Sequence, residues 1–255
     1  MPVGVKFFES GDGTQVENML LENGFERPRE PLNTCQLVAI ARIQGRKIFA
    51  TRNDMACVVG AVTLGLIEEP EIMKKGYLAS SSRKDLDLAV EFTKSIPRVH
   101  DKQVSSVAVC PLKSMPFEPD VIVIYGNSLQ VMKIITSYLW DKQGRVEVAL
   151  GGEFSVCGDV IAKTYITNRL QFSIPCNGER VSAGVSENEL SVGIPGKDIV
   201  GVCEGLKRSA YQLVEPEMKP ELDKMPYYFP NGYLTLQARK LKIEMLKARA
   251  ESAKN

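Results

Sequence analysis

Four cysteines are the residues of this chain most able to do chemistry, and they occur as two similar pairs. Cys35 and Cys57 each precede an apolar helical segment, and they bracket a short strand at residues 47–51. Cys157 and Cys176 flank a second strand-like run in the same way. Thiolates bind soft metals and iron–sulfur clusters and attack electrophiles. The pattern predicts a four-thiol site, although cysteine is also often buried for packing alone.

A single histidine, His100, limits the other chemistry that the chain can offer. Ser-His-Asp triads, two-histidine iron sites and histidine-rich zinc sites all depend on imidazole. His100 lies in a polar stretch after a predicted helix, where a solvated loop residue is the better interpretation. A metal in this protein would therefore be held mainly by sulfur or oxygen.

Composition indicates a globular chain without a bias toward nucleic acid or membranes. The 255 residues are 44% hydrophobic and 25% charged, with a formal net charge of +1. The first residues lack the features of a signal peptide, and the longest apolar run, residues 56–67, is too short to span a bilayer. We expect a cytoplasmic protein with no nucleic-acid partner. Its six cysteines would then be free, metal-bound or redox-active.

The second half of the chain repeats the pattern of the first. A proline and a strand open each half, a cysteine and an apolar helical segment follow, and a strand then leads to the second cysteine. The closing strands, SSVAVCPL and ELSVGIPG, also match. The repeat predicts an α/β (α+β) protein with two similar halves, residues 1–115 and 116–213, with mixed sheets covered by helices. One continuous sheet with helices on both faces is the alternative.

Several short motifs resemble an uncharacterised prokaryotic family, domain of unknown function 169, which is common in archaea and anaerobic bacteria. They are P-V-G-V-K-F at the start, A-C-x2-G-A-x2-L-G-L, P-F-x-P-D-V, G-G-x3-V-C-x-D, and I-P-C-x-G-x-R followed by V-G-I-P. The resemblance covers about residues 2–208. It implies no established reaction, but an anaerobic distribution favours an oxygen-sensitive cofactor. The matching positions are Lys6, Cys35, Cys57, Cys157, Cys176, Gly178 and Arg180.

The spacing of the four cysteines leaves the cofactor open. Structural zinc sites usually draw on two tight C-x2-C pairs, whereas these cysteines lie singly on four elements. We expect Cys35, Cys57, Cys157 and Cys176 to bind an iron–sulfur cluster, [4Fe–4S] first and zinc as the alternative. Thiol chemistry, a bound organic cofactor and plain packing remain as further interpretations.

Three further residues are predicted to bind an anionic ligand or to lie beside a negatively charged cluster. Lys6 is a cation within an apolar strand. It would either supply a positive charge to an anionic ligand or extend into solvent at the edge of a sheet. Gly178 would let backbone approach a ligand, and Arg180 could clamp a carboxylate or phosphate, or form an ordinary surface salt bridge.

These features lead to two main functional hypotheses, with a structural subunit of a larger complex as a third. The first is a redox or electron-transfer protein of anaerobic metabolism that carries a cysteine-bound metal or cluster, and whether it is an enzyme stays open. The second is a non-enzymatic subunit that binds a cofactor, delivers a metal or assists assembly in a larger complex.

The C-terminal segment, residues 214–255, lies beyond the resemblance. Its first part is rich in proline, and residues 234–253 have the composition of a basic amphipathic helix. We expect this arm to dock on a protein partner, most simply a second subunit of a homo-oligomer, and its last residues to fray.

Overall fold

The computed structural model describes residues 1–9, 13–99, 104–208 and 244. Residues 1–209 form one compact unit and residues 210–255 a second. The features described below belong to the first unit. His100 and almost all of the predicted C-terminal arm lie outside the described residues.

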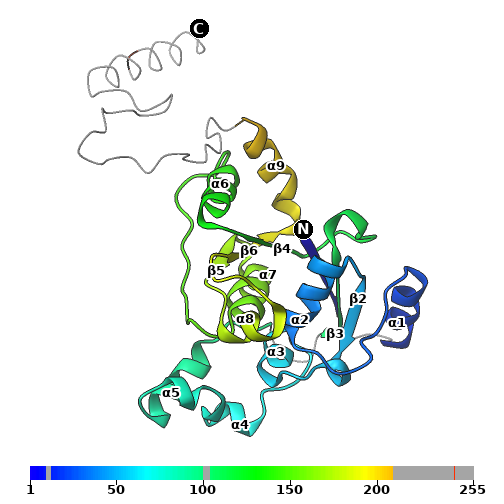
Figure 1. The fold of residues 1–255 in the computed structure, drawn as a ribbon, viewed down its shortest axis with the longest axis vertical. Helices are drawn as coiled ribbons and strands as arrows, with labels where there is room; N and C mark the ends of the chain where they lie inside the picture. The colour runs from blue at the N-terminus through cyan, green and yellow to red at the C-terminus, as the bar shows by residue number, and fades with distance from the viewer. Residues whose placement is uncertain (10–12, 100–103, 209–243, 245–255) are drawn as a thin grey trace. The chain divides into compact units, whose positions relative to one another are not determined.

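Six strands form one sheet, and every neighbouring pair within it is antiparallel. The strand order is β2-β3-β1-β4-β6-β5 (Figure 1). The sheet is therefore continuous and antiparallel, where mixed sheets were expected. The strands are β1 (Val3–Glu9), β2 (Ile48–Thr51), β3 (Val104–Pro111), β4 (Val121–Gly126), β5 (Gln171–Ser173) and β6 (Leu190–Pro195).

Helices follow the strands in both halves of the sequence. The α-helices are α1 (Gly13–Glu22), α2 (Thr34–Ala39), α3 (Val58–Thr63), α4 (Glu71–Lys74), α5 (Leu86–Ser95), α6 (Ser128–Tyr138), α7 (Lys163–Thr167), α8 (Asn177–Ala183) and α9 (Ile199–Arg208). Two π-helical segments, Ile40–Gln44 after α2 and Ser155–Ala162 before α7, were not predicted. Among the described residues, no helix is long and apolar enough to cross a membrane.

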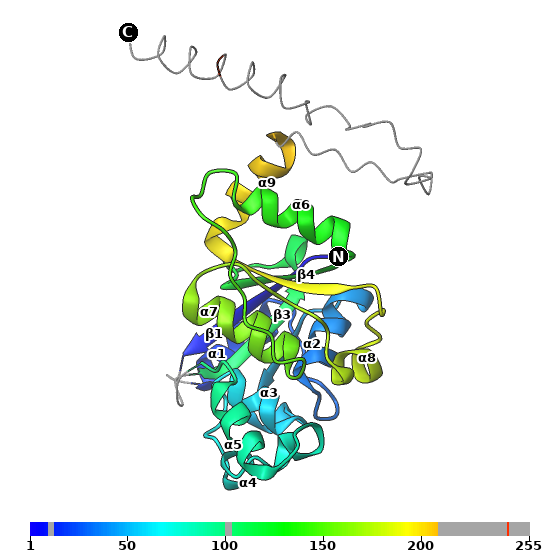
Figure 2. The same ribbon diagram turned by 90° about the vertical axis from the view of Figure 1, so that its left-hand side faces the viewer.

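Both faces of the sheet are covered, so most strand residues are buried. On β1, Val3, Val5 and Phe7 enter the larger core, which also contains residues of α2 and the second π-helical segment. On the opposite face, Ile122 and Ile194 pack with α6 and α9, while Phe49 packs with α1. Figure 2 shows α6 and α9 on one side of the sheet and α7 and α8 on the other. Val3, Val5 and Phe7 thus share one face of the sheet, as the alternation of side chains along a strand requires.

The two halves are arranged symmetrically within this sheet. The first half contributes β2-β3-β1 and the second contributes β4-β6-β5, so that β1 and β4 meet at the centre. The backbone N–H of Leu112 donates to the Pro2 carbonyl at 3.0 Å, and that of Gly196 donates to the Asp120 carbonyl at 2.9 Å. Each bond ties the end of a half's last strand to the start of its first strand. The internal repeat is therefore visible in topology and in hydrogen bonding.

The symmetry is interrupted by an insertion in the first half. Between α3 and β3 the chain forms α4, a 3₁₀ segment at Tyr77–Ser82 and α5, whereas a short loop joins α8 to β6. Met73 of α4 and Ile96 after α5 pack with residues of α3. The insertion therefore covers α3 and the cysteine that precedes it.

Candidate functional site

All four predicted cysteines line one cavity of about 220 Å³. Cys35 lies in the first turn of α2, and Cys57 directly precedes α3. Cys157 lies in the second π-helical segment, and Cys176 directly precedes α8. Each half of the chain thus supplies one cysteine within a helical segment and one at a helix start. The two pairs recognised in the sequence converge in space.

The first pair is positioned by helices α2 and α3. Cys35 is buried, and its thiol donates to the backbone carbonyl of Gly178 in α8 at 3.7 Å. Cys57 is partly exposed, and its sulfur accepts a hydrogen bond from the backbone N–H of Gly60 at 3.4 Å. Gly60 lies close to α2, because a Cβ there would approach Thr34 Oγ1 to 2.5 Å. A glycine at this position lets the two helices of the first pair approach each other.

The second pair depends on an unusual backbone. Phe154 has a left-handed conformation, with φ of 55°, which is uncommon for an aromatic residue. Its carbonyl oxygen accepts hydrogen bonds from the backbone N–H of Gly158 and from the thiol of Cys157. Cys176 is partly exposed and caps α8. Strained residues and π-helical turns are concentrated at functional sites, and both occur here beside Cys157.

Burial opposes ionisation of the two cysteines that lie within helical segments. Burial raises the pKa of Cys35 to about 12, with Cys176, Glu179 and Cys57 adding to the effect. Burial also raises the pKa of Cys157 well above its ordinary value. A coordinated metal would reverse this preference, because a metal-bound thiol is deprotonated. Metal binding at this cavity would therefore release protons.

The donor set of the cavity fits a sulfur-bound metal or cluster. Thiolates are the ligands that iron–sulfur clusters require and that zinc accepts. The volume is several times the share of about 30 Å³ that one water molecule occupies, so there is room for such a group. In the part of the chain that the structure describes, no three Cys, His, Asp or Glu residues are already grouped to hold a metal ion.

Glu179 is a central residue of the site that the sequence interpretation missed. It lines the cavity, and its side chain is fully buried. One carboxyl oxygen accepts from the hydroxyl of Tyr125 at 2.8 Å, and the other accepts from the backbone N–H groups of Cys176 and Val156, each at 3.1 Å. Burial raises its pKa despite these bonds. The available signal was the C-x-x-E spacing from Cys176, which forms a capping box at α8.

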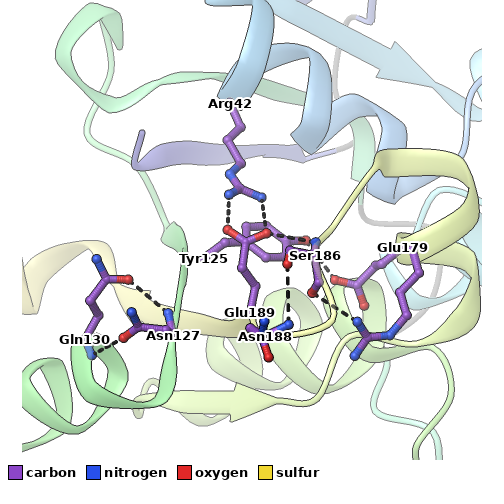
Figure 3. A network of polar contacts seen from close by, with 9 residues as sticks. Arg42, Tyr125, Asn127, Gln130, Glu179, Ser186, Asn188 and Glu189 are labelled. Atoms are coloured by element: carbon purple, nitrogen blue, oxygen red, sulfur yellow. Dashed lines mark hydrogen bonds and ion pairs between the residues drawn. The ribbon is translucent and has the colours of Figure 1, made fainter. Parts of the chain in front are cut away.

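A polar network extends from Glu179 toward the first half of the chain (Figure 3). The guanidinium of Arg42 lies over the ring of Tyr125, 4.6 Å from its centroid, and pairs with both carboxyl oxygens of Glu189. Glu189 in turn accepts from the backbone N–H of Ser186. Figure 3 shows these groups converging from both halves of the chain. The network therefore fixes one half against the other beside the cysteines.

The three residues predicted to bind an anion are not brought together. Gly178 lines the cysteine cavity. Lys6 lines a different cavity and forms an ion pair with Asp120 at 2.9 Å. Its neighbours Val5 and Phe7 face the cysteine-bearing helices, so strand alternation directs Lys6 to the other side.

Arg180 is likewise not among the residues that line the cysteine cavity. Its guanidinium donates to the backbone carbonyl of Ser186 at 3.0 Å, which is a structural contact. No lysine, arginine or histidine lines the cavity within the described part of the chain. The cavity therefore does not have the charge expected of an anion site.

Comparison with known proteins places the chain in a family. Residues 1–205 match the model of the family described as uncharacterised ArCR, domain of unknown function 169, and the chain belongs to this family. It is 27% identical over 190 residues to the uncharacterised protein MJ0308 of Methanocaldococcus jannaschii. The alignment covers 73% of this chain and 81% of the relative. No solved structure matches the chain. The resemblance drawn from the motifs is confirmed.

Proposed function

We propose that this protein binds a metal or iron–sulfur cluster, preferably [4Fe–4S], through Cys35, Cys57, Cys157 and Cys176, and has a redox or electron-transfer role in anaerobic metabolism. The observation that carries the proposal is the convergence of these four cysteines, from four separate elements, on one cavity. Packing alone does not require four thiols at one place, since most cysteines pack singly against apolar neighbours.

The residues of the cavity would have distinct tasks. Cys35 and Cys157 are buried, and they would hold the inner side of the bound group away from water. Cys57 and Cys176 are partly exposed, and they would hold its outer side. A cluster bound there would supply one-electron transfer. The partly exposed pair would give a redox partner the shortest approach to it.

Anaerobic purification of the full-length protein tests the proposal directly. The expected result is a brown protein with about four irons and an equal amount of acid-labile sulfide, and an absorbance that bleaches on reduction. One zinc per chain without sulfide would establish the zinc alternative. A colourless, metal-free protein that also fails to take up iron and sulfide, or zinc, on reconstitution would overturn metal binding.

Single Cys→Ser variants locate the metal, with two matched controls in the same chain. Each of the four cavity cysteines is expected to be needed for full metal content. Cys110 is buried in β3 and Cys203 is exposed on α9, and neither lines the cavity. Cys110→Ser and Cys203→Ser should therefore keep the metal content of the unmodified protein. Equal loss in the controls would contradict the assignment.

The second candidate function is a non-enzymatic subunit that delivers a metal or cofactor or assists assembly. It is favoured by the partial exposure of Cys57 and Cys176, because a group held by accessible thiols can pass to a partner by ligand exchange. The distinguishing measurement is transfer of bound metal to a metal-free acceptor protein. Fast transfer without redox activity supports delivery, whereas retained metal with a reversible reduction potential supports electron transfer.

A further inference from the structure

A second cavity, of about 400 Å³, lies at the C-terminal end of helix α6. Its size is in the range of small-molecule sites, and its wall shares no residue with that of the cysteine cavity. Three side chains of the wall are basic and one is acidic: Lys142, Arg145 and Arg169, and Glu147. The wall therefore has the positive charge that the cysteine cavity lacks.

Tyr138, the last residue of α6, holds the two segments of this wall together. Its hydroxyl accepts a hydrogen bond from the backbone N–H of Leu170 at 3.3 Å. Val146 packs against the apolar cluster that contains Tyr138 and Leu170. Arg169 directly precedes Leu170 in the sequence. Arg145 precedes Val146 in the same way, so both arginine side chains extend from backbone that is anchored at one tyrosine.

The two arginines carry the uncompensated charge of the wall. Both are exposed, and neither guanidinium makes a hydrogen bond or ion pair within the described residues. Lys142 differs, because its ammonium group pairs with Asp141 at 3.4 Å and with Asp198 at 3.5 Å. Within the wall, the charge of the arginines is opposed by Glu147 alone.

The cavity beside β2 shows that such an excess of positive charge is not a general feature of this surface. Its volume is about 460 Å³, and two arginines and two glutamates line it: Arg29 and Arg46, and Glu26 and Glu30. Arg46 forms an ion pair with Glu26. The charges there are equal in number, so that wall does not favour an anion.

The chemistry of the free guanidinium groups identifies a class of ligand. A guanidinium presents a planar set of N–H donors that matches two oxygens of a phosphate. A phosphomonoester carries nearly two negative charges at neutral pH, and it can therefore pair with two arginines. Leu139 and Val146 are partly exposed in the same wall, where they offer apolar surface to the organic part of a ligand.

We propose that this cavity binds the phosphate group of a small phosphorylated organic molecule through Arg145 and Arg169. The inference goes beyond the proposed function, because this site lies apart from the cysteines and requires no metal.

Phenyl phosphate is the probe, titrated into the full-length protein as purified and followed by isothermal titration calorimetry. Binding should saturate at one molecule per chain at pH 8 and low salt. The affinity should fall as sodium chloride is added, because the attraction is between charges at an exposed site. Phenol is the matched control, since it has the ring without the phosphate, and it should give no saturable heat at the same concentrations.

Single substitutions connect the binding to the two arginines. Arg145→Gln and Arg169→Gln should each weaken phenyl phosphate about tenfold, since a charge-assisted hydrogen bond is lost. Arg52→Gln removes an exposed arginine outside the cavity and should leave the affinity unchanged. All three variants should keep the midpoint of thermal unfolding, because exposed side chains contribute little to stability.

The inference is overturned if phenyl phosphate gives no saturable binding, if phenol binds equally well, or if both cavity substitutions leave the affinity unchanged. It is also overturned if arginine-dependent binding is seen only with phosphatidylglycerol vesicles, since the phosphate would then belong to a lipid headgroup.

Metal content measured on the same samples keeps the two proposals apart. Absence of phenyl phosphate binding by a protein with its full metal content would overturn this inference alone. Saturable binding by a protein that takes up no metal would overturn the proposed function alone.

Discussion

The hydroxyl of Tyr125 donates a 2.8 Å hydrogen bond to the buried carboxyl group of Glu179, and this contact links β4 to α8. The other carboxyl oxygen of Glu179 accepts hydrogen bonds from the backbone N–H groups of Val156 and Cys176. Val156 directly precedes Cys157, so both cysteines of the second pair are connected to this carboxyl group. One side chain therefore sets the relative position of two cysteine-bearing segments.

Tyr125→Phe should lower the free energy of unfolding by about 1–3 kcal/mol, because it leaves a buried carboxyl oxygen without its donor. Urea unfolding provides the measurement. Tyr165→Phe is the matched control, since the Tyr165 ring packs against Phe7 and its hydroxyl makes no hydrogen bond within the described residues. The control should change stability by no more than about 0.5 kcal/mol. Equal effects of the two substitutions would contradict this role of Tyr125.

The ion pair between Arg42 and Glu189 should make stability depend on pH in the acid range. Partial burial raises the pKa of Glu189, but hydrogen bonds from Arg42 and from the Ser186 backbone hold it below its ordinary value of 4.5. A lowered pKa in the folded state means that the stabilisation is complete above pH 4.5 and is lost as the pH falls through the folded pKa.

Glu189→Gln should therefore destabilise the protein by about 1 kcal/mol near pH 7 and by less as the pH falls below about 4. Unfolding free energies measured across this pH range test the prediction. Arg42→Lys should lose part of the same stabilisation, because lysine cannot pair with both carboxyl oxygens. A stability difference that does not change with pH would show that Glu189 acts by packing alone.

Two glycines of helix α9 provide a matched pair of substitutions. A Cβ on Gly205 would approach the carbonyl oxygen of Ser137 in α6 to 2.3 Å, whereas one on Gly201 would make an ordinary 3.7 Å contact with Asp141. Gly205→Ala should destabilise the protein by roughly 1–3 kcal/mol by forcing α6 and α9 apart. Gly201→Ala should stabilise it by up to about 1 kcal/mol through helix propensity. Thermal unfolding of both variants checks the expected opposite signs.

The two cysteines outside the cavity should differ sharply in reactivity. Cys203 is exposed, whereas Cys110 is fully buried, and burial raises the pKa of Cys110 to about 11. Iodoacetamide at pH 8 should label Cys203 rapidly and Cys110 only after denaturant is added. Mass spectrometry of the digested protein gives the time course. Rapid labelling of native Cys110 would show that β3 opens far more readily than its packing indicates.

The C-terminal arm is predicted to dock on a second subunit or on another protein partner. Removal of residues 216–255 should reduce the solution mass of the assembly from that of an oligomer to that of a monomer, or abolish binding of a protein partner. Light scattering on both forms of the chain provides the measurement. An unchanged oligomeric state and unchanged partners would leave the arm a surface appendage.

The cysteine pairs and the repeat could be recognised from sequence because both depend on local patterns. The apolar segments beside Cys35 and Cys57 and the strand between them, predicted at residues 47–51, could be recognised in this way, and the structure has α2, α3 and β2 there. The grouping of strands also followed from the repeat. The antiparallel order did not, because strand pairing depends on contacts that are distant in sequence.

The polar part of the site was harder to predict. Glu179 is a glutamate in a short polar stretch, and only the fold shows that its side chain is fully buried. Lys6 and Arg180 were expected beside the cysteines because of their charge, but charge does not determine which side of a strand or helix faces a cavity. The π-helical segment around Cys157 has no sequence signature that distinguishes it from an α-helix.

The central pairing of β1 with β4 has an evolutionary consequence. Each half holds two of the cysteines and one free edge of a three-stranded sheet, so two copies of a half-length chain that joined at this edge would complete both the sheet and the four-thiol cavity. Such an arrangement is what gene duplication and fusion of a homodimeric ancestor would leave. Later changes could then diverge between the copies, as the insertion present only in the first half has done.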